Sequence, residues 1–240
     1  MDPEYLTAHV QEDRQHWYFR GRATVINAAL RRVLPPRRLR LVDLGCGTGA
    51  VLRALAEFGE AVGIEDSDAL LEVARASGLD ARKGMLPGDL PIAPGWADVV
   101  LLLDVIEHLD DDLAALRAAG TVLAACGMLV LTAPAYPWLW SAHDVVLGHR
   151  RRYVATGLRR LVERAGFGVE RLTYFNTVLF PLIAGRRLYK QWLGDHRHDL
   201  QRPGRALNIL LEGLFSLERH VVPVVTLPFG TSLFLVARRP

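Results

Sequence analysis

The chain has 240 residues, half of them hydrophobic, which is enough to bury the core of one domain with an appendage. Its 29 basic and 26 acidic side chains leave a formal charge of +3, and the arginine clusters are scattered rather than interleaved with aromatic residues, which argues against a nucleic-acid-binding surface. The two cysteines, Cys46 and Cys126, form no disulfide framework, and the opening segment is charged and aromatic, so a reducing cytoplasmic compartment is expected.

The first segments of the chain have the apolar spacing of helices. Helices are expected at 4–10 and 17–34, the second ending before two prolines. Strands and helices then alternate. Strands are expected at 40–44, 61–65, 99–103 and 127–133, with a degenerate strand at 79–84 and helices at 50–58, 68–76 and 113–123. This alternation predicts an α/β fold with a Rossmann-like, doubly wound, mostly parallel sheet and helices on both faces.

The second half of the chain supplies the remaining elements. A long irregular stretch at 134–153 is followed by a helix at 155–165 and a strand at 168–174, and helices at 182–193 and 207–217 precede a last strand at 232–237. The sheet therefore has seven predicted strands. We divide the chain into an N-terminal helical cap (1–36), a core with the substrate loop 134–153 (37–174), and a helical insertion whose last strand completes the same domain (175–240).

A glycine-rich loop follows the first predicted strand. The strand ends on Asp43, and the loop contains Gly45, Cys46, Gly47 and Gly49. Glycines let the backbone turn sharply and approach a ligand closely. The loop lacks the Gly-Lys-Ser/Thr ending of a phosphate-binding P-loop and the G-x-G-x-x-G spacing of a dinucleotide site. The preceding acid would repel a pyrophosphate but suits the cationic amino-acid end of a nucleoside cofactor.

With this D-L-G-C-G-T-G signature the chain resembles the class I S-adenosylmethionine (SAM)-dependent methyltransferases. The resemblance implies that all five of these residues belong to the SAM site. The alternative is a tight strand-to-helix turn without a chemical role.

Further cofactor residues are expected after the second and third strands. Glu65 ends the second strand, where a carboxylate can accept both hydroxyls of a ribose. Asp66 either joins this site or caps the next helix beside Ser67. Relatives often place an acid after the third strand to bind adenine, whereas this chain has Met85 followed by Leu86. We therefore expect backbone groups at these two residues to bind the adenine, with Met85 packed on the ring.

The segment from Ala97 to Leu109 resembles the fourth-strand signature F-D-x-V-x-x-x-D-V-x-E-H-x of the small-molecule branch of these methyltransferases. Asp104 ends the strand at the rim where ligands of such sheets bind, so the methionine part of SAM is expected beside it. His108 either lines the site or is held by the helix that follows.

Two regions are candidates for binding the methyl acceptor. The N-terminal H-W-Y-F sequence, with Trp17 and Tyr18, resembles a helix that covers the cofactor in bacterial relatives. The alternative is that this helix only docks onto the sheet. The second region is the loop 134–153, whose H-D-x-x-x-G-H-x-R-R-Y pattern also occurs in those relatives.

Within that loop we expect His143 to be a general base, because histidine titrates near neutral pH, and Asp144 to orient an imidazole. The residues expected to hold an anionic or hydroxyl-rich substrate are His149, Arg151, Arg152 and Tyr153. The spacing of His143, Asp144 and His149 does not match a common zinc site, so no metal is predicted.

These features predict a SAM-dependent methyltransferase that releases S-adenosylhomocysteine and acts on oxygen, or less readily nitrogen, of a small, sugar or lipid-linked acceptor. The alternatives are a non-catalytic SAM-binding partner subunit and an RNA methyltransferase. The arginine-rich composition is typical of a GC-rich bacterial genome. The amphipathic helix at 182–193 fits either peripheral membrane contact through 175–217, at the inner membrane face, or packing over the site. The sequence does not predict the oligomeric state.

Overall fold

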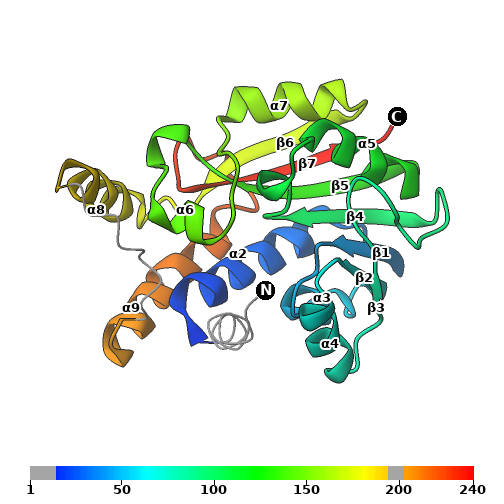
Figure 1. Cartoon of the computed structure of the whole chain (residues 1–240), viewed down its shortest axis with the longest axis horizontal. Helices are drawn as coiled ribbons and strands as arrows, with labels where there is room; N and C mark the ends of the chain where they lie inside the picture. The colour runs from blue at the N-terminus through cyan, green and yellow to red at the C-terminus, as the bar shows by residue number, and fades with distance from the viewer. Residues whose placement is uncertain (1–14, 194–202) are drawn as a thin grey trace.

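A computed structural model describes residues 15–193 and 203–240 of the protein, and its centre is one seven-stranded sheet (Figure 1). The strands are β1 (Leu39–Leu44), β2 (Gly59–Glu65), β3 (Ala81–Lys83), β4 (Ala97–Leu103), β5 (Leu123–Pro134), β6 (Gly168–Phe175) and β7 (Ser232–Arg238). Their order is β3-β2-β1-β4-β5-β7-β6, with β1 to β5 parallel and β7 antiparallel to both of its neighbours. The predicted mostly parallel sheet of seven strands is confirmed.

The helices follow the predicted alternation. They are α2 (Trp17–Val33), α3 (Ala50–Leu55), α4 (Asp68–Ala76), α5 (Asp112–Val122), α6 (Ala142–Val146), α7 (Ala155–Arg164), α8 (Phe180–Leu193) and α9 (Arg205–Ser216). Three short 3₁₀ helices are η1 (Ile106–His108), η2 (Pro137–Leu139) and η3 (Leu217–His220). The expected helix at 4–10 lies outside the described residues.

The stretch 134–153 is more regular than predicted, because it contains η2 and α6. A capping box explains why so short a helix as α6 forms there. The backbone N–H of Ser141 donates to Asp144, and the Ser141 side chain in turn accepts from the backbone of Asp144. The two side chains thereby satisfy donors that a helix start otherwise leaves unpaired. Single-sequence periodicity does not detect a helix of one turn.

Both faces of the sheet are buried, each under its own helices. On one face, Val42 of β1 and Val100 of β4 pack with side chains of α5 and α7. On the other, Leu41 of β1 and Leu101 of β4 pack with α2, α3, α4 and α9. Figure 1 shows α5 and α7 above the strands and the second group below them. Each buried aliphatic side chain contributes about 1.5–3 kcal/mol, so these two layers supply most of the stabilisation.

Helix α2 packs against the sheet and α9 together. Its buried stripe, Val25, Ile26, Ala29 and Leu30, follows the three- and four-residue spacing of one helix face. Gly21 lets α9 approach, because a Cβ at this position would lie 2.7 Å from Cδ1 of the Phe215 ring. The N-terminal segment is therefore built into the fold.

The chain reverses its direction of sheet growth between β3 and β4. Strands β2 and β3 add outward from β1, and β4 then returns to pair with the opposite side of β1. Such a switch point leaves a crevice beyond the carboxyl ends of the two central strands, where ligands of open α/β sheets bind. The crevice of this chain lies beyond Leu44 and Leu103.

A buried carboxylate connects the end of β6 to η3. Glu218 accepts hydrogen bonds from the backbone N–H groups of Asn176, Thr177 and Val178, at 2.7, 2.6 and 2.8 Å. Glu218 is 2% exposed, and burial raises its pKa while the three N–H donors oppose that shift. The side chain thus fixes the turn that leads into α8.

We predict that Glu218→Ala destabilises the protein by about 2–4 kcal/mol, because three N–H groups lose their acceptor in a buried place. Urea unfolding measures the effect. Glu170→Ala is the matched control, since Glu170 forms an exposed ion pair with Arg238 and its loss should cost no more than about 1 kcal/mol. An equal loss of stability in the two variants would contradict the role of Glu218 in fixing this turn.

Candidate active site

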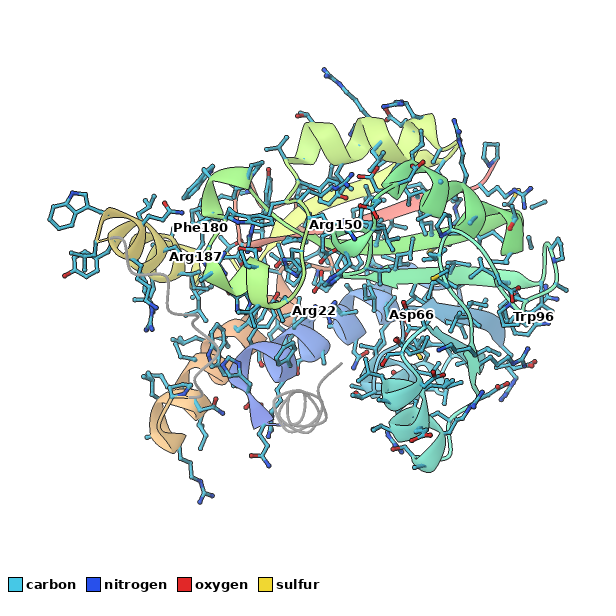
Figure 2. The ribbon with its side chains drawn as sticks, viewed as in Figure 1. Arg22, Asp66, Trp96, Arg150, Phe180 and Arg187 are labelled. Atoms are coloured by element: carbon cyan, nitrogen blue, oxygen red, sulfur yellow. The ribbon has the colours of Figure 1, made fainter. Side chains whose placement is uncertain are left out.

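A large cavity occupies the crevice beyond β1 and β4. Its volume is about 1360 Å³, above the roughly 300–1,000 Å³ of a typical single-ligand pocket. Its walls come from α2, the glycine loop, the segment after β4, the loop 143–152 and helices α8 and α9. Figure 2 shows Arg22, Asp66 and Arg187, three lining residues that come from different elements. The cavity has room for two small molecules side by side.

The three predicted glycines have different structural roles. Gly45, Gly47 and Gly49 all have positive φ, at 77°, 56° and 80°. A Cβ on Gly45 would lie 2.7 Å from Val105, and one on Gly49 would lie 2.3 Å from Leu79, so these two allow close packing. Apart from its two chain neighbours, no atom of the described residues lies within 4 Å of the Cβ position of Gly47, which lines the cavity. Gly47 is therefore where a ligand can approach the backbone.

Glu65 holds the glycine loop in place. Its carboxylate accepts from the backbone N–H groups of Gly47 and Ser67, both at 2.9 Å. Burial raises its pKa, which the two N–H donors counteract. Each carboxylate oxygen has a second lone pair, so Glu65 can still accept a hydroxyl from the cavity that it lines.

Cys46, Asp66, Met85 and Leu86, which were also predicted to bind the cofactor, lie on the cavity wall as well. Burial raises the pKa of the Cys46 thiol, and a Cβ on Gly63 would lie 2.5 Å from its sulfur, so Cys46 fills the space that this glycine leaves. Ser67 is the N-cap of α4, which leaves Asp66 exposed on the wall. Met85 is 58% exposed there, next to Leu86.

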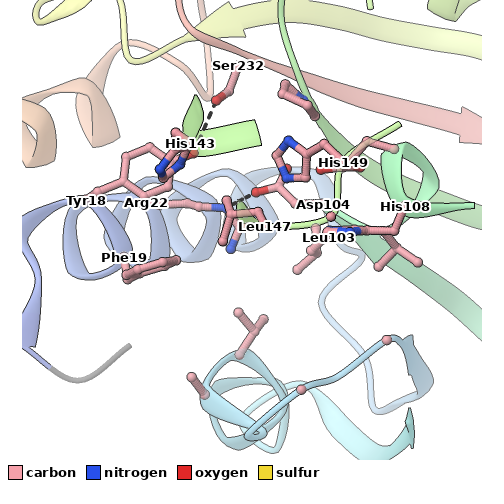
Figure 3. A pocket seen from close by; sticks show the side chains of 18 of the residues that line it. Tyr18, Phe19, Arg22, Leu103, Asp104, His108, His143, Leu147, His149 and Ser232 are labelled. Carbon is pink, nitrogen blue, oxygen red and sulfur yellow. Dashed lines mark hydrogen bonds and ion pairs between the residues drawn. The ribbon is translucent and has the colours of Figure 1, made fainter. Parts of the chain in front are cut away.

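An ion pair joins α2 to the end of β4. Arg22 Nε lies 2.8 Å from Asp104 Oδ2, and a second guanidinium nitrogen donates to Thr132 on β5 at 3.1 Å. The Thr132 hydroxyl donates to the other oxygen of Asp104 at 2.8 Å. Asp104 itself has a φ of 59°, a conformation seldom adopted outside glycine. Figure 3 shows the Arg22–Asp104 pair in the cavity wall.

Asp43 lies beneath this pair, at the end of β1. It is 2% exposed, and burial raises its pKa to about 7 even though the Arg22 guanidinium opposes the shift. The Asp43 carboxyl group therefore loses its proton less readily than an exposed carboxyl group. An approaching cation would favour its charged form.

The loop 143–153 is organised by one buried acid. Asp144 is completely buried and accepts from His149 Nδ1 at 2.9 Å and from Arg152 Nε at 2.7 Å. These contacts and the surrounding cations hold its pKa far below the usual range. Asp144 therefore orients His149, and it is not among the residues that line the cavity.

His143 lies on the cavity wall in a different environment (Figure 3). Burial lowers its pKa to about 3, and the nearby Arg187 guanidinium adds to the shift. Its Nδ1 is buried, with no hydrogen-bond partner in the described part of the chain. The imidazole is consequently neutral throughout the physiological pH range.

Two predicted substrate residues point away from the cavity. Arg151 donates to Asp112 at 3.1 Å, and the Tyr153 hydroxyl donates to the same carboxylate at 2.9 Å. Neither lines the cavity, whereas Arg152 does. Arg151 and Tyr153 thus anchor the loop to α5.

Most of the predicted site residues line the cavity. Predicted site residues that line the cavity are Trp17, Tyr18, Asp43, Gly45, Cys46, Gly47, Glu65, Asp66, Met85, Leu86, Asp104, His108, His143, His149 and Arg152. Those that do not are Gly49, Asp144, Arg151 and Tyr153.

Sequence reasoning missed several charged residues of the site, among them Arg22, Glu107 and Arg187. Arg22 falls on the same helical stripe as Val25 and Ile26, and a charge within an apolar stripe was the available signal. Glu107 is fully buried beside the cavity, and its position in the D-V-I-E-H segment was the only hint. Burial, assisted by Asp104, raises the pKa of Glu107 well above its usual value.

Comparison with known proteins identifies the class. A family model described as a methyltransferase domain matches residues 14–172. Together with the fold and this cavity, the match shows that the chain belongs to the class I SAM-dependent methyltransferases. The protein is accordingly an enzyme whose cofactor is SAM.

Curated relatives match part of the chain. A ubiquinone biosynthesis O-methyltransferase of Cereibacter sphaeroides is 37% identical over 103 residues, which cover 40% of this chain and 42% of the relative. A probable SAM-dependent methyltransferase of Mycolicibacterium smegmatis is 31% identical over 135 residues, 54% of this chain and 52% of the relative. The chain thus spans about half or less of the length of these relatives.

Solved structures share the fold over nearly the whole chain. One is a methyltransferase in complex with the Haloferax volcanii Trm112 methyltransferase activator. The TM-score is 0.67 at 19% identity, covering 99% of this chain and 95% of the other. At this identity the likeness establishes the fold alone.

We predict that Gly47→Ala weakens binding of S-adenosylhomocysteine at least tenfold, because the added methyl group would project into the cavity. Calorimetric titration measures this. Gly78→Ala is the matched control, since Gly78 has a similar φ of 76° and does not line the cavity. Within residues 15–193 and 203–240, its chain neighbours apart, no atom lies within 4 Å of its Cβ position. Both variants carry the cost of about 1–3 kcal/mol for a left-handed residue. Unchanged affinity in Gly47→Ala would contradict a cofactor at this loop.

Proposed function

We propose that the enzyme methylates an oxygen atom of a small or lipid-linked acceptor. The observation that carries the proposal is the single large cavity, which extends from the glycine loop to His143 and the helices α8 and α9. When bound, SAM supplies an electrophilic methyl group on a sulfonium. The chain then has to align an acceptor with that group and to remove one proton from the acceptor.

The cofactor half of the cavity lies over β1, β2 and β4. We assign the ribose hydroxyls to Glu65 and the amino-acid end to Asp43, Asp104 and the backbone at Gly47. The buried carboxylates favour this end, because it carries an ammonium group. Met85 and Leu86 are assigned to the adenine, with the exposed Met85 side chain available to cover the ring.

The acceptor half combines apolar and polar groups. Leu182 and Leu207, from α8 and α9, line it together with His143 and Arg187. Trp17 and Tyr18 line the cavity from α2, and the Tyr18 hydroxyl lies 3.4 Å from Ser232 Oγ. An acceptor with an apolar body and a hydroxyl group is complementary to such a surface. The curated relative whose name specifies O-methylation supports oxygen over nitrogen as the acceptor atom.

His143 is the proposed general base, and its pKa limits what it contributes. A conjugate acid with a pKa of about 3 makes the imidazole a weak base, although a neutral one that can always accept a hydrogen bond. We therefore assign to His143 a modest part of the rate enhancement, in which the imidazole orients the acceptor and transiently takes up its proton.

We predict that His143→Ala lowers kcat about tenfold and leaves the affinity for S-adenosylhomocysteine unchanged. Transfer of labelled methyl from SAM into solvent-extracted lipids and aqueous metabolites supplies the assay. Because His143 titrates near pH 3, the wild-type rate should show no histidine-like loss between pH 7 and about pH 5.5. A loss in that range that disappears in His143→Ala would contradict the neutral imidazole. Cofactor binding without transfer to either fraction would favour a non-catalytic subunit.

The acceptor is proposed to reach the cavity from a membrane surface. Among the described residues, no helix has the length and apolarity to cross a bilayer. Helix α8 nevertheless buries only Ala184 fully, while Tyr189 is 60% and Trp192 is 81% exposed. Figure 1 shows α8 projecting from the body of the protein. With Lys190 on the same helix, it has the aromatic and basic character of an interfacial helix.

We predict that Trp192→Ser reduces co-sedimentation with anionic phosphatidylglycerol vesicles several-fold, because Trp192 is the most exposed large apolar side chain of this helix. Added salt should weaken the binding of the wild type and of Trp192→Ser to these vesicles. Val154→Ser is the control, since Val154 is 41% exposed but precedes α7. If wild type and both variants sediment alike, α8 has no membrane role.

A further inference from the structure

Three potential metal ligands meet at the cavity wall between the cofactor and acceptor halves. Glu107 and His108 follow β4 in η1, and His149 comes from the loop after α6. One ligand atom from each side chain lies within 4.8 Å of the other two. The rings of His108 and His149 are 4.8 Å apart between centroids and nearly perpendicular, at 79° (Figure 3). All three residues line the cavity.

Glu107 is the observation that calls for a ligand. Its side chain is completely buried, and neither carboxylate oxygen has a hydrogen-bond partner in the described part of the chain. Leaving a buried carboxyl group without a hydrogen-bond partner destabilises the folded protein, and more so when the group is charged. A bound cation would remove this cost.

The two histidines are held as metal ligands usually are. Asp144 accepts from His149 Nδ1, which leaves Nε2 as the ligand atom. His108 has a hydrogen bond to the backbone of Gly148. In metal sites, a ligating histidine typically donates its other ring N–H to a carboxylate or a backbone carbonyl.

We propose that Glu107, His108 and His149 bind one divalent transition-metal ion of the Zn²⁺ type. Two imidazoles and one carboxylate form a ligand set of catalytic zinc sites, in which further coordination positions stay open to substrate or water. Here those positions would face the cavity. The sequence gives no signal for this set of ligands, because Glu107 and His108 lie some forty residues from His149 along the chain.

The ion has a task in the proposed methyl transfer, and this part of the inference rests on the proposed function. A metal ion lowers the pKa of a coordinated hydroxyl, which then loses its proton to water in the cavity. The resulting oxygen anion forms the new O–CH₃ bond as the carbon–sulfur bond of SAM breaks. The electron pair of that bond remains on sulfur. Activation of this kind supplies what the weak base His143 does not.

Zinc binding to the full chain tests the site directly. The protein is stripped with a chelator, dialysed and titrated with Zn²⁺ by calorimetry, and with Co²⁺ by visible absorption. We expect one tight ion in wild type and at least tenfold weaker binding in Glu107→Gln and in His149→Ala. His220→Ala is the control, because His220 lies in η3 and contacts Arg219. Circular dichroism establishes which variants fold, and either ligand variant is sufficient for the comparison.

The possible results separate the two proposals. No tight ion in wild type, or equal affinity in wild type and the folded ligand variants, overturns the metal site. Methyl transfer that is unchanged after chelation overturns the catalytic task of the ion and leaves the proposed function intact. Tight zinc binding at the three residues, with no transfer to any acceptor with or without metal, supports the site and contradicts the proposed function.

Discussion

The cavity depends on one buried cation, the guanidinium of Arg22. It is paired with Asp104, and its charge also opposes the pKa increase that burial imposes on Asp43 and Glu107. Three carboxyl groups could hardly share this space without it, since like charges at low dielectric repel strongly. Because Arg22 belongs to α2, the helix that precedes the sheet completes the electrostatics of a site made at the ends of β1 and β4.

The sequence was sufficient to predict the sheet and the acids and glycine loop of the cavity wall. Strand and helix periodicities are local, so they can be recognised in a single sequence. The acids Asp43, Glu65 and Asp104 can be recognised as well, because each lies at the end of a predicted strand. Side-chain pairing across long separations could not be predicted from the sequence. The local sequence does not show that Asp144 bonds to His149 rather than to His143. Nor does it show that Arg151 is paired with Asp112. Such partners are set by packing of the folded chain.

The two halves of the cavity are built in different ways. The cofactor half uses strand ends and backbone groups, whose positions follow from the sheet itself. The acceptor half uses appended segments: α2, the loop anchored by Asp144, and the helices α8 and α9. These can change in length and character while the sheet is kept, which is how one fold serves many acceptors. On this assignment, the methyl donor is bound by the sheet that the family shares, and the acceptor is selected by the segments appended to it.

Strand β7 has a consequence for how the protein is made. It lies between β5 and β6 and pairs with both, from Ser232 to Arg238. Until those residues leave the ribosome, β6 has no partner in the sheet and β5 presents an open edge. Exposed strand edges are prone to pairing with other chains. The sheet thus stays open along β5 until β7 has been made and can pair with both β5 and β6.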